Sequence, residues 1–290
     1  MASQGTTLPP PASSKASSDT ENQTTRVSSW DHWRNYVMSS IKPEWSSAPL
    51  IAFCFMTGFI DAIAFSAVFV WPGFQTGNSV QLSLALARLF SPGETDLSFR
   101  PPDRAALVSL ITFVLGAFIG RIGDRMGAKT RAWLFLGTMI QALFTMAAAL
   151  CIWKSGNGSI ASDRGDPAWT AALAYVTIGF MSASLGLQGI MGKRVNGQFA
   201  TTIVLTTIWC ELMADPKLFT PKYVISRDHK IAAIFCVFLG GFIGRAILQS
   251  IGSAGALGVG TGFRVLIAVW WLFVGEPKNQ AMETEKGAQR

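Results

Sequence analysis

The sequence predicts an all-α protein, a polytopic transmembrane helical bundle with six to eight spans and two internally repeated halves. Half of the 290 residues are hydrophobic and only 14% are charged, whereas about a quarter of a soluble domain is charged. The apolar residues gather in runs, several of them close to the roughly 20 residues that a helix needs to cross a bilayer. One seven-residue segment also occurs twice, with a single difference. Composition, run length and repetition therefore agree on a duplicated membrane protein.

The chain begins with two segments that precede the membrane domain. Residues 1–28 are rich in Ser, Thr, Pro and Gln, and such a composition cannot bury enough apolar surface to offset the entropy of ordering. We expect a disordered cytoplasmic tail. In residues 29–48, large apolar side chains recur at intervals of three or four: Trp30, Trp33, Val37, Ile41 and Trp45. This spacing predicts an amphipathic interfacial segment with tryptophans at headgroup depth.

Residues 49–275 form the predicted transmembrane domain, and residues 276–290 a second cytoplasmic tail. The apolar runs cover residues 49–71, 74–90, 105–122, 133–153, 168–191, 199–214, 231–251 and 262–275. The runs 74–90 and 199–214 are short and contain polar residues. If these two enter and leave on the same side, six spans remain, and if they cross there are eight. Both alternatives place the two termini in the cytoplasm.

A repeat divides the transmembrane domain into halves at about residues 49–153 and 168–275. Residues 115–121 (LGAFIGR) return as residues 239–245 (LGGFIGR). Each copy contains a Gly-x-x-x-Gly pair, which lets two helix backbones approach closely. We interpret these pairs as packing features. A duplicated helical framework of this kind is typical of secondary transporters.

Asp61 is the only charged residue in the first run, and it lies near the middle of that run. A carboxylate at that depth costs about 2.5–3.5 kcal/mol and usually marks an ion, proton or substrate path. A weaker echo pairs Gly58-Phe59 with Gly179-Phe180, which matches Asp61 with Ser182. The alternative is a protonated Asp61 that only bonds a neighbouring helix.

The second run contains a polar group, Thr76, Gly77 and Asn78, followed by Gln81. Glycine beside Thr and Asn allows a helix to open, and the freed carbonyls could bind a cation or polar solute. Gln81 lies on the same helical face as Asn78. We therefore place these residues with Asp61 on a candidate substrate or ion path. The alternative is a helical hairpin whose polar groups satisfy one another.

Other polar side chains fall inside apolar runs. Arg245 is a predicted charge partner for Asp61 or for Glu211, although it could also extend outward to the interface. Gln141 and Gln188 are isolated amides within their runs, which predicts hydrogen bonds between helices.

Several of these motifs resemble one known family. They are Gly58 to Ala62, Thr76-Gly77-Asn78, the repeated Leu-Gly-x-Phe-Ile-Gly-Arg segment, Ala200-Thr201-Thr202 and Val204 to Thr207, with Cys210-Glu211-Leu212 and Asp215-Pro216. Over about residues 50–275 the chain resembles the YoaK-like family of multi-pass membrane proteins, in particular its fungal branch. That family has no known function, so the resemblance implies a membrane location and no substrate.

A second, shorter resemblance covers ten residues from Gly120 to Lys129. Its Gly120, Asp124, Arg125, Gly127 and Lys129 are similar to the cytoplasmic loop of major facilitator transporters. The resemblance implies that acidic and basic side chains latch neighbouring helices there. The alternative is a basic loop held at the lipid headgroups.

These observations favour a small secondary transporter or permease for a polar or ionic solute, with proton coupling through Asp61. The alternative is a non-transporting membrane adaptor or scaffold. We expect no enzyme, metal or cofactor, because the four cysteines fall in different apolar runs and the two histidines in different loops. The net charge of +7 is explained by basic loops rather than by nucleic acid. The expected partners are the bilayer and an unknown small solute, and a homo-oligomer is compatible with the sequence. The organelle stays open.

Overall fold

The protein is all-helical over the residues that its computed structural model describes, which are 29–91, 98–163, 166–196 and 205–275. Within these ranges the only β pairing consists of two isolated bridges, Ser40 with Thr130 and Asp163 with Asp166. The predicted tails, residues 1–28 and 276–290, lie outside the described ranges.

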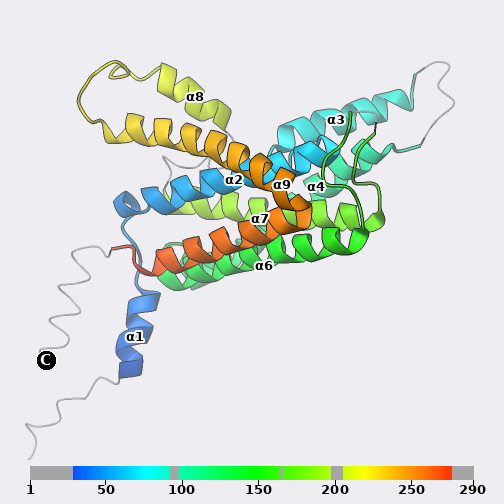
Figure 1. Ribbon diagram of the computed structural model, residues 1–290. Helices are drawn as coiled ribbons and strands as arrows, with labels where there is room; N and C mark the ends of the chain where they lie inside the picture. Colours follow the sequence, from blue (N-terminus) through cyan, green and yellow to red (C-terminus); the bar gives the residue numbers. More distant parts are fainter. Residues whose placement is uncertain (1–28, 92–97, 164–165, 197–204, 276–290) are drawn as a thin grey trace, which may run out of the picture.

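Five helical stretches among the described residues are long and apolar enough to cross a membrane, which makes this a multi-pass membrane protein. They lie side by side in Figure 1. They are α2 (Ser47–Val68), α4 with α5 (Pro101–Ile119 and Ile122–Met126), α6 (Arg131–Ser155), α7 (Ala172–Val195) and α9 (Ile225–Leu272).

The helix α9 has two arms. At 1.5 Å per residue, a straight helix of 48 residues would be about 72 Å long, more than twice the thickness of the hydrocarbon core of a bilayer. Gly252 breaks it with a left-handed φ of 74°, a conformation that glycine adopts without steric cost. The chain turns back there, so residues 225–251 and 253–272 run in opposite directions (Figure 1). The Ser253 N–H donates a 2.9 Å hydrogen bond to the hydroxyl of Ser159, which holds this turn in place.

Two short helices take the place of the short polar runs. They are α3 (Gln75–Arg88) and α8 (Leu205–Met213), and neither is among the candidate spans. Nine residues of helix are about 14 Å long, half of what a crossing needs. Part of the predicted run 199–214, residues 199–204, lies outside the described ranges. The count of five is one lower than the predicted six because α9 contains the run 231–251 and most of the run 262–275. The predicted eight also counted the two short runs.

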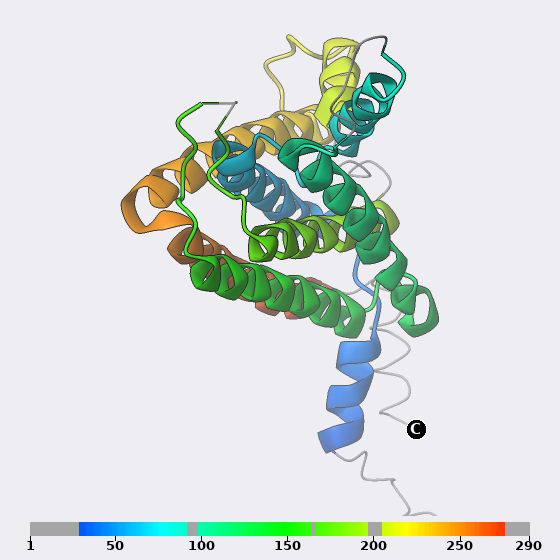
Figure 2. The same cartoon turned by 90° about the vertical axis from the view of Figure 1, so that its right-hand side faces the viewer.

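The two ends of the bundle carry different elements. The α1 end carries α1 (Ser29–Met38), the 3-10 turn η1 (Pro43–Trp45), the start of α2 and the ends of α7 and α9. The α3 end carries the end of α2, α3, the start of α7 and the turn of α9. Figures 1 and 2 show α1 projecting across the direction of the long helices. Its Trp30 and Trp33 are exposed, and the interfacial position of this segment stays a prediction.

Two close helix pairs organise the bundle. In the first, α2 runs parallel to the first arm of α9, and a β-carbon on Gly240 would lie 2.0 Å from the carbonyl oxygen of Phe55. In the second, α4 runs parallel to α7, and a β-carbon on Gly116 would lie 2.0 Å from the carbonyl oxygen of Ala183. Such backbone contact is the packing that Gly-x-x-x-Gly pairs permit. Both pairs join helices that are far apart in the sequence.

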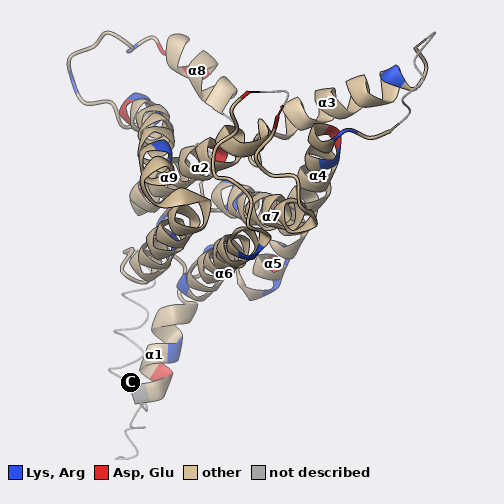
Figure 3. Ribbon diagram, turned by 45° about the vertical axis from the view of Figure 1, so that its right-hand side comes forward, with Lys and Arg blue, Asp and Glu red and all other residues tan. Residues whose placement is uncertain are grey.

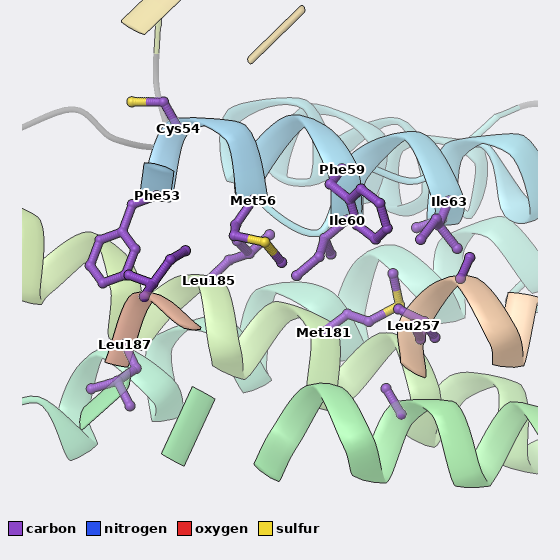
Figure 4. Close-up of a cluster of buried hydrophobic side chains, with 14 of the residues drawn as sticks. Phe53, Cys54, Met56, Phe59, Ile60, Ile63, Met181, Leu185, Leu187 and Leu257 are labelled. Carbon is purple, nitrogen blue, oxygen red and sulfur yellow. The ribbon is translucent and has the colours of Figure 1, made fainter. Parts of the chain in front are cut away.

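Apolar side chains fill the space between the pairs. Phe53, Met56 and Ile60 on α2 extend toward Leu185 on α7 (Figure 4), and all four are fully buried. In a membrane this interdigitation stabilises by van der Waals contact, since lipid tails are as apolar as the core. Charged side chains lie mainly near helix ends and in loops (Figure 3).

A buried arginine closes the α1 end. Arg131 is only 2% exposed and donates to the carbonyl oxygen of Val274 from Nε at 3.1 Å and from Nη2 at 2.6 Å. It also donates to the Tyr36 carbonyl oxygen at 3.1 Å and to the Ser39 hydroxyl. Its guanidinium lies 4.3 Å over the Tyr36 ring. We call this group, Arg131 with Tyr36, Ser39 and Val274, the end clamp.

Candidate functional site

The candidate site begins where the chain leaves α2. Residues 71–73, Trp-Pro-Gly, turn back toward the helix, and the Gly73 N–H donates a 2.8 Å hydrogen bond to Oδ1 of Asp61. Asp61 lies seven residues before the last residue of α2, about 10 Å along the axis. Its half-buried side chain therefore faces the turn that links α2 to α3.

Asn78 connects this turn to the neighbouring helices. Its side chain is almost fully buried, and its amide nitrogen lies 3.0 Å from the Trp71 carbonyl oxygen, 3.1 Å from Oε1 of Gln75 and 2.9 Å from Oγ of Ser109. The Ser109 hydroxyl in turn lies 2.8 Å from the hydroxyl of Ser182 on α7. We call this network, with Asp61 and the turn 71–73, the polar junction. It joins α2, α3, α4 and α7.

A cavity of about 360 Å³ adjoins the polar junction. Three predicted path residues line it, Gly77, Asn78 and Gln81, together with Phe65, Phe69, Trp71 and Pro102. Thr76 is exposed on the outer side of α3. Asp61 is not among the lining residues. It is connected to the cavity through the turn 71–73, because it accepts a hydrogen bond from Gly73 and Trp71 lines the cavity.

The predicted opening of the helix at Thr76-Gly77-Asn78 does not occur, because α3 is continuous from Gln75 to Arg88 and these residues form its first turn. The carbonyl groups available at this site belong instead to the preceding turn. The Pro72 carbonyl oxygen accepts from the side chain of Gln75 at 2.7 Å, as the Trp71 carbonyl oxygen accepts from Asn78.

The predicted charge pairs are not formed. Arg245 is exposed, because the neighbouring Gly244 faces α2 and successive helical residues point about 100° apart. Glu211 pairs with Lys230 at 3.4 Å, and Asp61 accepts from Gly73. The alternative in which Arg245 extends away from the bundle fits this geometry.

The facilitator-like loop makes a contact that the sequence analysis missed. Arg194, near the end of α7, forms a 2.7 Å ion pair with Asp124 and donates to the Gly120 carbonyl oxygen at 2.9 Å. These two bonds connect α7 to the junction of α4 and α5. Arg125 and Lys129 are exposed. Gly127 has a left-handed φ of 94° and turns the chain into α6.

A second polar group, in the middle of the bundle, was also missed. Arg264, on the second arm of α9, is fully buried. Its Nη1 donates to Oε1 of Gln141 on α6, and its Nη2 donates to the hydroxyl of Ser184 on α7 at 3.2 Å. Its Nε has no hydrogen-bond partner. The Gln141 amide nitrogen lies 3.1 Å from the sulfur of Met191. We call Arg264, Gln141 and Ser184 the central cluster.

The sequence does carry a signal for Arg264. Residues 137–143 (GTMIQAL) and residues 260–266 (GTGFRVL) share Gly, Thr and Leu at matching positions, so the two segments align Gln141 with Arg264. Arg264 is only the third residue of the predicted run 262–275, so the argument applied to Asp61, a charge near the middle of an apolar run, applies to Arg264 only once its position inside α9 is known.

Gln188 lies one helical turn after Ser184. Its side-chain nitrogen donates to the Phe53 carbonyl oxygen at 3.0 Å and to the Thr57 hydroxyl at 2.8 Å. Its own carbonyl oxygen is buried without a partner. Gln141 bonds α9, and Gln188 bonds α2, so the predicted hydrogen bonds between helices are confirmed.

Among the described residues, no group of three or more His, Cys, Asp or Glu side chains could hold a metal ion. The chemistry available at the two polar groups is hydrogen bonding, charge pairing and, at Asp61, proton exchange.

A comparison with protein families gave one match. The family model described as "Protein of unknown function (DUF1275)" covers residues 50–270. The match spans nearly all of the long helices and includes both polar groups. It is consistent with the resemblance in the sequence, since both point to a family of unknown function. Searches among curated proteins and solved structures found no match.

Proposed function

The chain belongs to the DUF1275 family, and because that family's function is unknown, we propose from the geometry that this multi-pass membrane protein is a small secondary transporter or permease. Its cargo would be a polar or ionic solute. The proposal makes it a carrier rather than an enzyme. The narrower resemblances, to a fungal branch and to major facilitator transporters, stay predictions.

The observation that carries the proposal is the polar junction beside its cavity. Asp61 accepts a hydrogen bond from the turn 71–73, and the same turn accepts one from Asn78, which lines the cavity. Buried polar side chains are expensive at membrane depth and are found where they face one another or a solute path. A cavity next to such a network supports a path for a solute.

The bonding of Asp61 suggests how a proton would be coupled to this path. An ionised carboxylate accepts a stronger hydrogen bond than a neutral carboxyl group does. Protonation of Asp61 would therefore weaken its bond to Gly73 and loosen the turn 71–73. Since Trp71 belongs to both the turn and the cavity lining, the proton would change the shape of the solute site.

The arrangement of the two halves supports alternating access. The first copy of the repeated segment, on α4, packs on α7 of the second half, and the second copy, on α9, packs on α2 of the first half. The end of α7 lies near the start of α2, where Asn196 bonds the Pro43 carbonyl oxygen. The start of α7 lies near the end of α2, where the Ala168 N–H bonds the Ala67 carbonyl oxygen.

We infer from these contacts two inverted repeats of three spans each, and we keep from the loop charges the prediction that both termini are cytoplasmic. Counting the two arms of α9 separately then gives six crossings. Inverted repeats that exchange their relative positions provide alternating access in many secondary transporters. The Asp124–Arg194 pair would hold one of the two positions.

The experiment is uptake into vesicles that contain the purified protein, with the outside acidified. Four radiolabelled probes represent four solute classes: lactate, glycine, glycerol and rubidium ion. We expect uptake of at least one probe above that of protein-free vesicles. Asp61→Asn should lower this uptake roughly tenfold or more, an increase of about 1.4 kcal/mol in the barrier.

Glu44→Gln is the matched control, because Glu44 is an exposed carboxylate just before α2, and we expect it to leave uptake unchanged. Wild-type uptake by the Asp61→Asn protein would contradict the role of Asp61. No uptake of any of the four probes would contradict transport and favour the adaptor.

A further inference from the structure

We propose that the central cluster is a binding site for a small monocarboxylate anion. The inference rests on the proposed transport only in making that anion the cargo, and it adds a binding position separate from the cavity beside the polar junction, whose lining shares no residue with the central cluster. The binding site itself is argued from the contacts of Arg264 and can be tested without any transport measurement.

The first argument is the unbalanced charge of Arg264. A guanidinium stays charged in proteins, and burying a charge is costly unless a counter-charge accompanies it. Both hydrogen-bond acceptors of Arg264 are neutral, the amide oxygen of Gln141 and the hydroxyl of Ser184. In the described part of the chain, Arg88, Arg194 and Arg227 each form an ion pair with an aspartate, and Arg264 forms none. A counter-anion from outside the fold would supply the missing charge.

The second argument is the presence of unused donors. The Nε of Arg264 is buried with no hydrogen-bond partner, although an unpaired buried donor of a charged group is costly. The Gln141 amide nitrogen has only the sulfur of Met191 within reach, and a thioether is a weak acceptor. A carboxylate has two oxygens with about four acceptor positions. It would satisfy these donors and the charge together.

The composition of the central cluster indicates the class of anion. One positive charge is balanced by one negative charge, whereas a dianion such as hydrogen phosphate would leave an excess charge in the core. The planar fork of a guanidinium matches the two oxygens of a carboxylate. The flexible side chain of Met191, which lies against Gln141, can move to admit a short apolar tail.

The place of the cluster in the fold agrees with this assignment. Arg264 lies well inside the second arm of α9, twelve residues after Gly252 and eight before Leu272. It joins α9 to α6 through Gln141 and to α7 through Ser184. Solute sites of inverted-repeat transporters lie near the bilayer midplane where the repeats meet.

The experiment is thermal unfolding of the detergent-purified protein in sodium lactate, compared with sodium chloride and sodium phosphate at equal ionic strength. A ligand that binds only the folded state raises the melting temperature, and at a hundredfold excess over Kd we expect roughly 5 °C for this chain length. We expect this increase with lactate and little or none with chloride or phosphate.

Gln141→Glu is the decisive variant. It places a carboxylate on the guanidinium of Arg264 and supplies the missing counter-charge from within the fold. We expect this variant to melt above the wild type without lactate and to show no further increase with lactate. Arg264→Met should also lose the response to lactate. Gln249→Glu, the same change at an exposed position on α9, should keep it.

The outcomes separate this inference from the proposed function. A wild type that does not respond to lactate overturns the site, as does a Gln141→Glu protein that still responds. An equal response to chloride or phosphate overturns the monocarboxylate class. Glycine or rubidium uptake by a protein insensitive to lactate would leave transport standing and reject the site. A rise in melting temperature with lactate but no uptake of any probe would support the binding site and reject transport.

Discussion

Two fully enclosed arginines of this protein have opposite surroundings. Arg131, in the end clamp, donates to three oxygen acceptors beyond its own helix and lies over an aromatic ring. Arg264, in the central cluster, donates to one amide oxygen and one hydroxyl, and its Nε has no partner. Both side chains are buried to nearly the same extent, so burial alone does not distinguish them.

The difference lies in what balances each charge. The end clamp places Arg131 on the carbonyl oxygen of Val274, just beyond the end of α9, and the end of a helix carries a partial negative charge. Unbonded carbonyls of that end also need donors. No helix end lies at Arg264, which is well inside its helix. We infer that the first arginine stabilises the fold, whereas the second is available for a ligand.

The largest predicted effect is that of Arg131→Met. It removes both hydrogen bonds that Arg131 donates to the Val274 carbonyl oxygen and leaves the Tyr36 carbonyl oxygen only the donors of Ser39, so we expect a loss of about 3 kcal/mol in the free energy of unfolding. The measurement is the melting temperature in detergent. Arg131→Lys keeps the positive charge but not the planar guanidinium, so we expect a smaller loss in the free energy of unfolding. If Arg131→Met melts at the same temperature as the wild type, the end clamp does not stabilise the fold.

Tyr36→Phe tests one contact of the end clamp. The Tyr36 hydroxyl donates to the Leu272 carbonyl oxygen at 2.7 Å, and the variant removes this bond but keeps the ring beneath Arg131. We expect a loss of about 1 kcal/mol, measured in the same way. Tyr223→Phe is the control, because Tyr223 is exposed. Equal melting of the two variants would show that the bond adds nothing.

Asp124→Asn removes a charge pair at the protein surface. The Asp124 side chain is about half exposed, and ion pairs of this kind contribute about 0.5 kcal/mol. We expect a small decrease in melting temperature at low salt that disappears at high salt, since salt screens exposed charges. A large decrease that persists in high salt would mean that the Arg194 contact holds the fold rather than a transport position.

The smallest predicted effect on stability is that of Arg264→Met, in spite of complete burial. The variant loses the hydrogen bonds that Arg264 donates to Gln141 and Ser184. It also removes an unbalanced charge from the core. Replacing a buried charge by an apolar side chain of similar size is often neutral, so we expect a net change in unfolding free energy close to zero and below that of Asp124→Asn. If this protein unfolds as easily as Arg131→Met, Arg264 has a structural role and the comparison fails.

Much of the fold was predictable from local sequence properties. The apolar run 49–71 corresponds to α2, and the repeated glycine segments lie at close helix contacts, as the Gly-x-x-x-Gly spacing indicates. The polar junction was predictable in part, because Asp61 and Asn78 are unusual inside apolar runs. The hydrogen bonds that link Asp61 and Asn78 through the turn 71–73 were not predictable, because Trp-Pro-Gly indicates a turn but not which groups it contacts.

The charge partners were the least predictable part of the candidate site. Arg245 and Arg264 lie in comparable apolar runs of the sequence, yet one is exposed and the other is buried. A helix turns by about 100° per residue, so the face on which an arginine lies depends on which neighbour its helix packs against. That neighbour is chosen by contacts between distant segments.

Hydrophobicity and run length, which each segment carries by itself, determined that this chain is a helical membrane protein with a polar connection between α2 and α3. Tertiary structure alone decided that α9 turns back at Gly252, that Arg131 meets Val274 and that Arg264 meets Gln141 and Ser184. The physical reason is the distance along the chain over which each effect acts. Transfer from water to lipid is a property of one segment, whereas the balance of a buried charge depends on groups that only the folded bundle brings together.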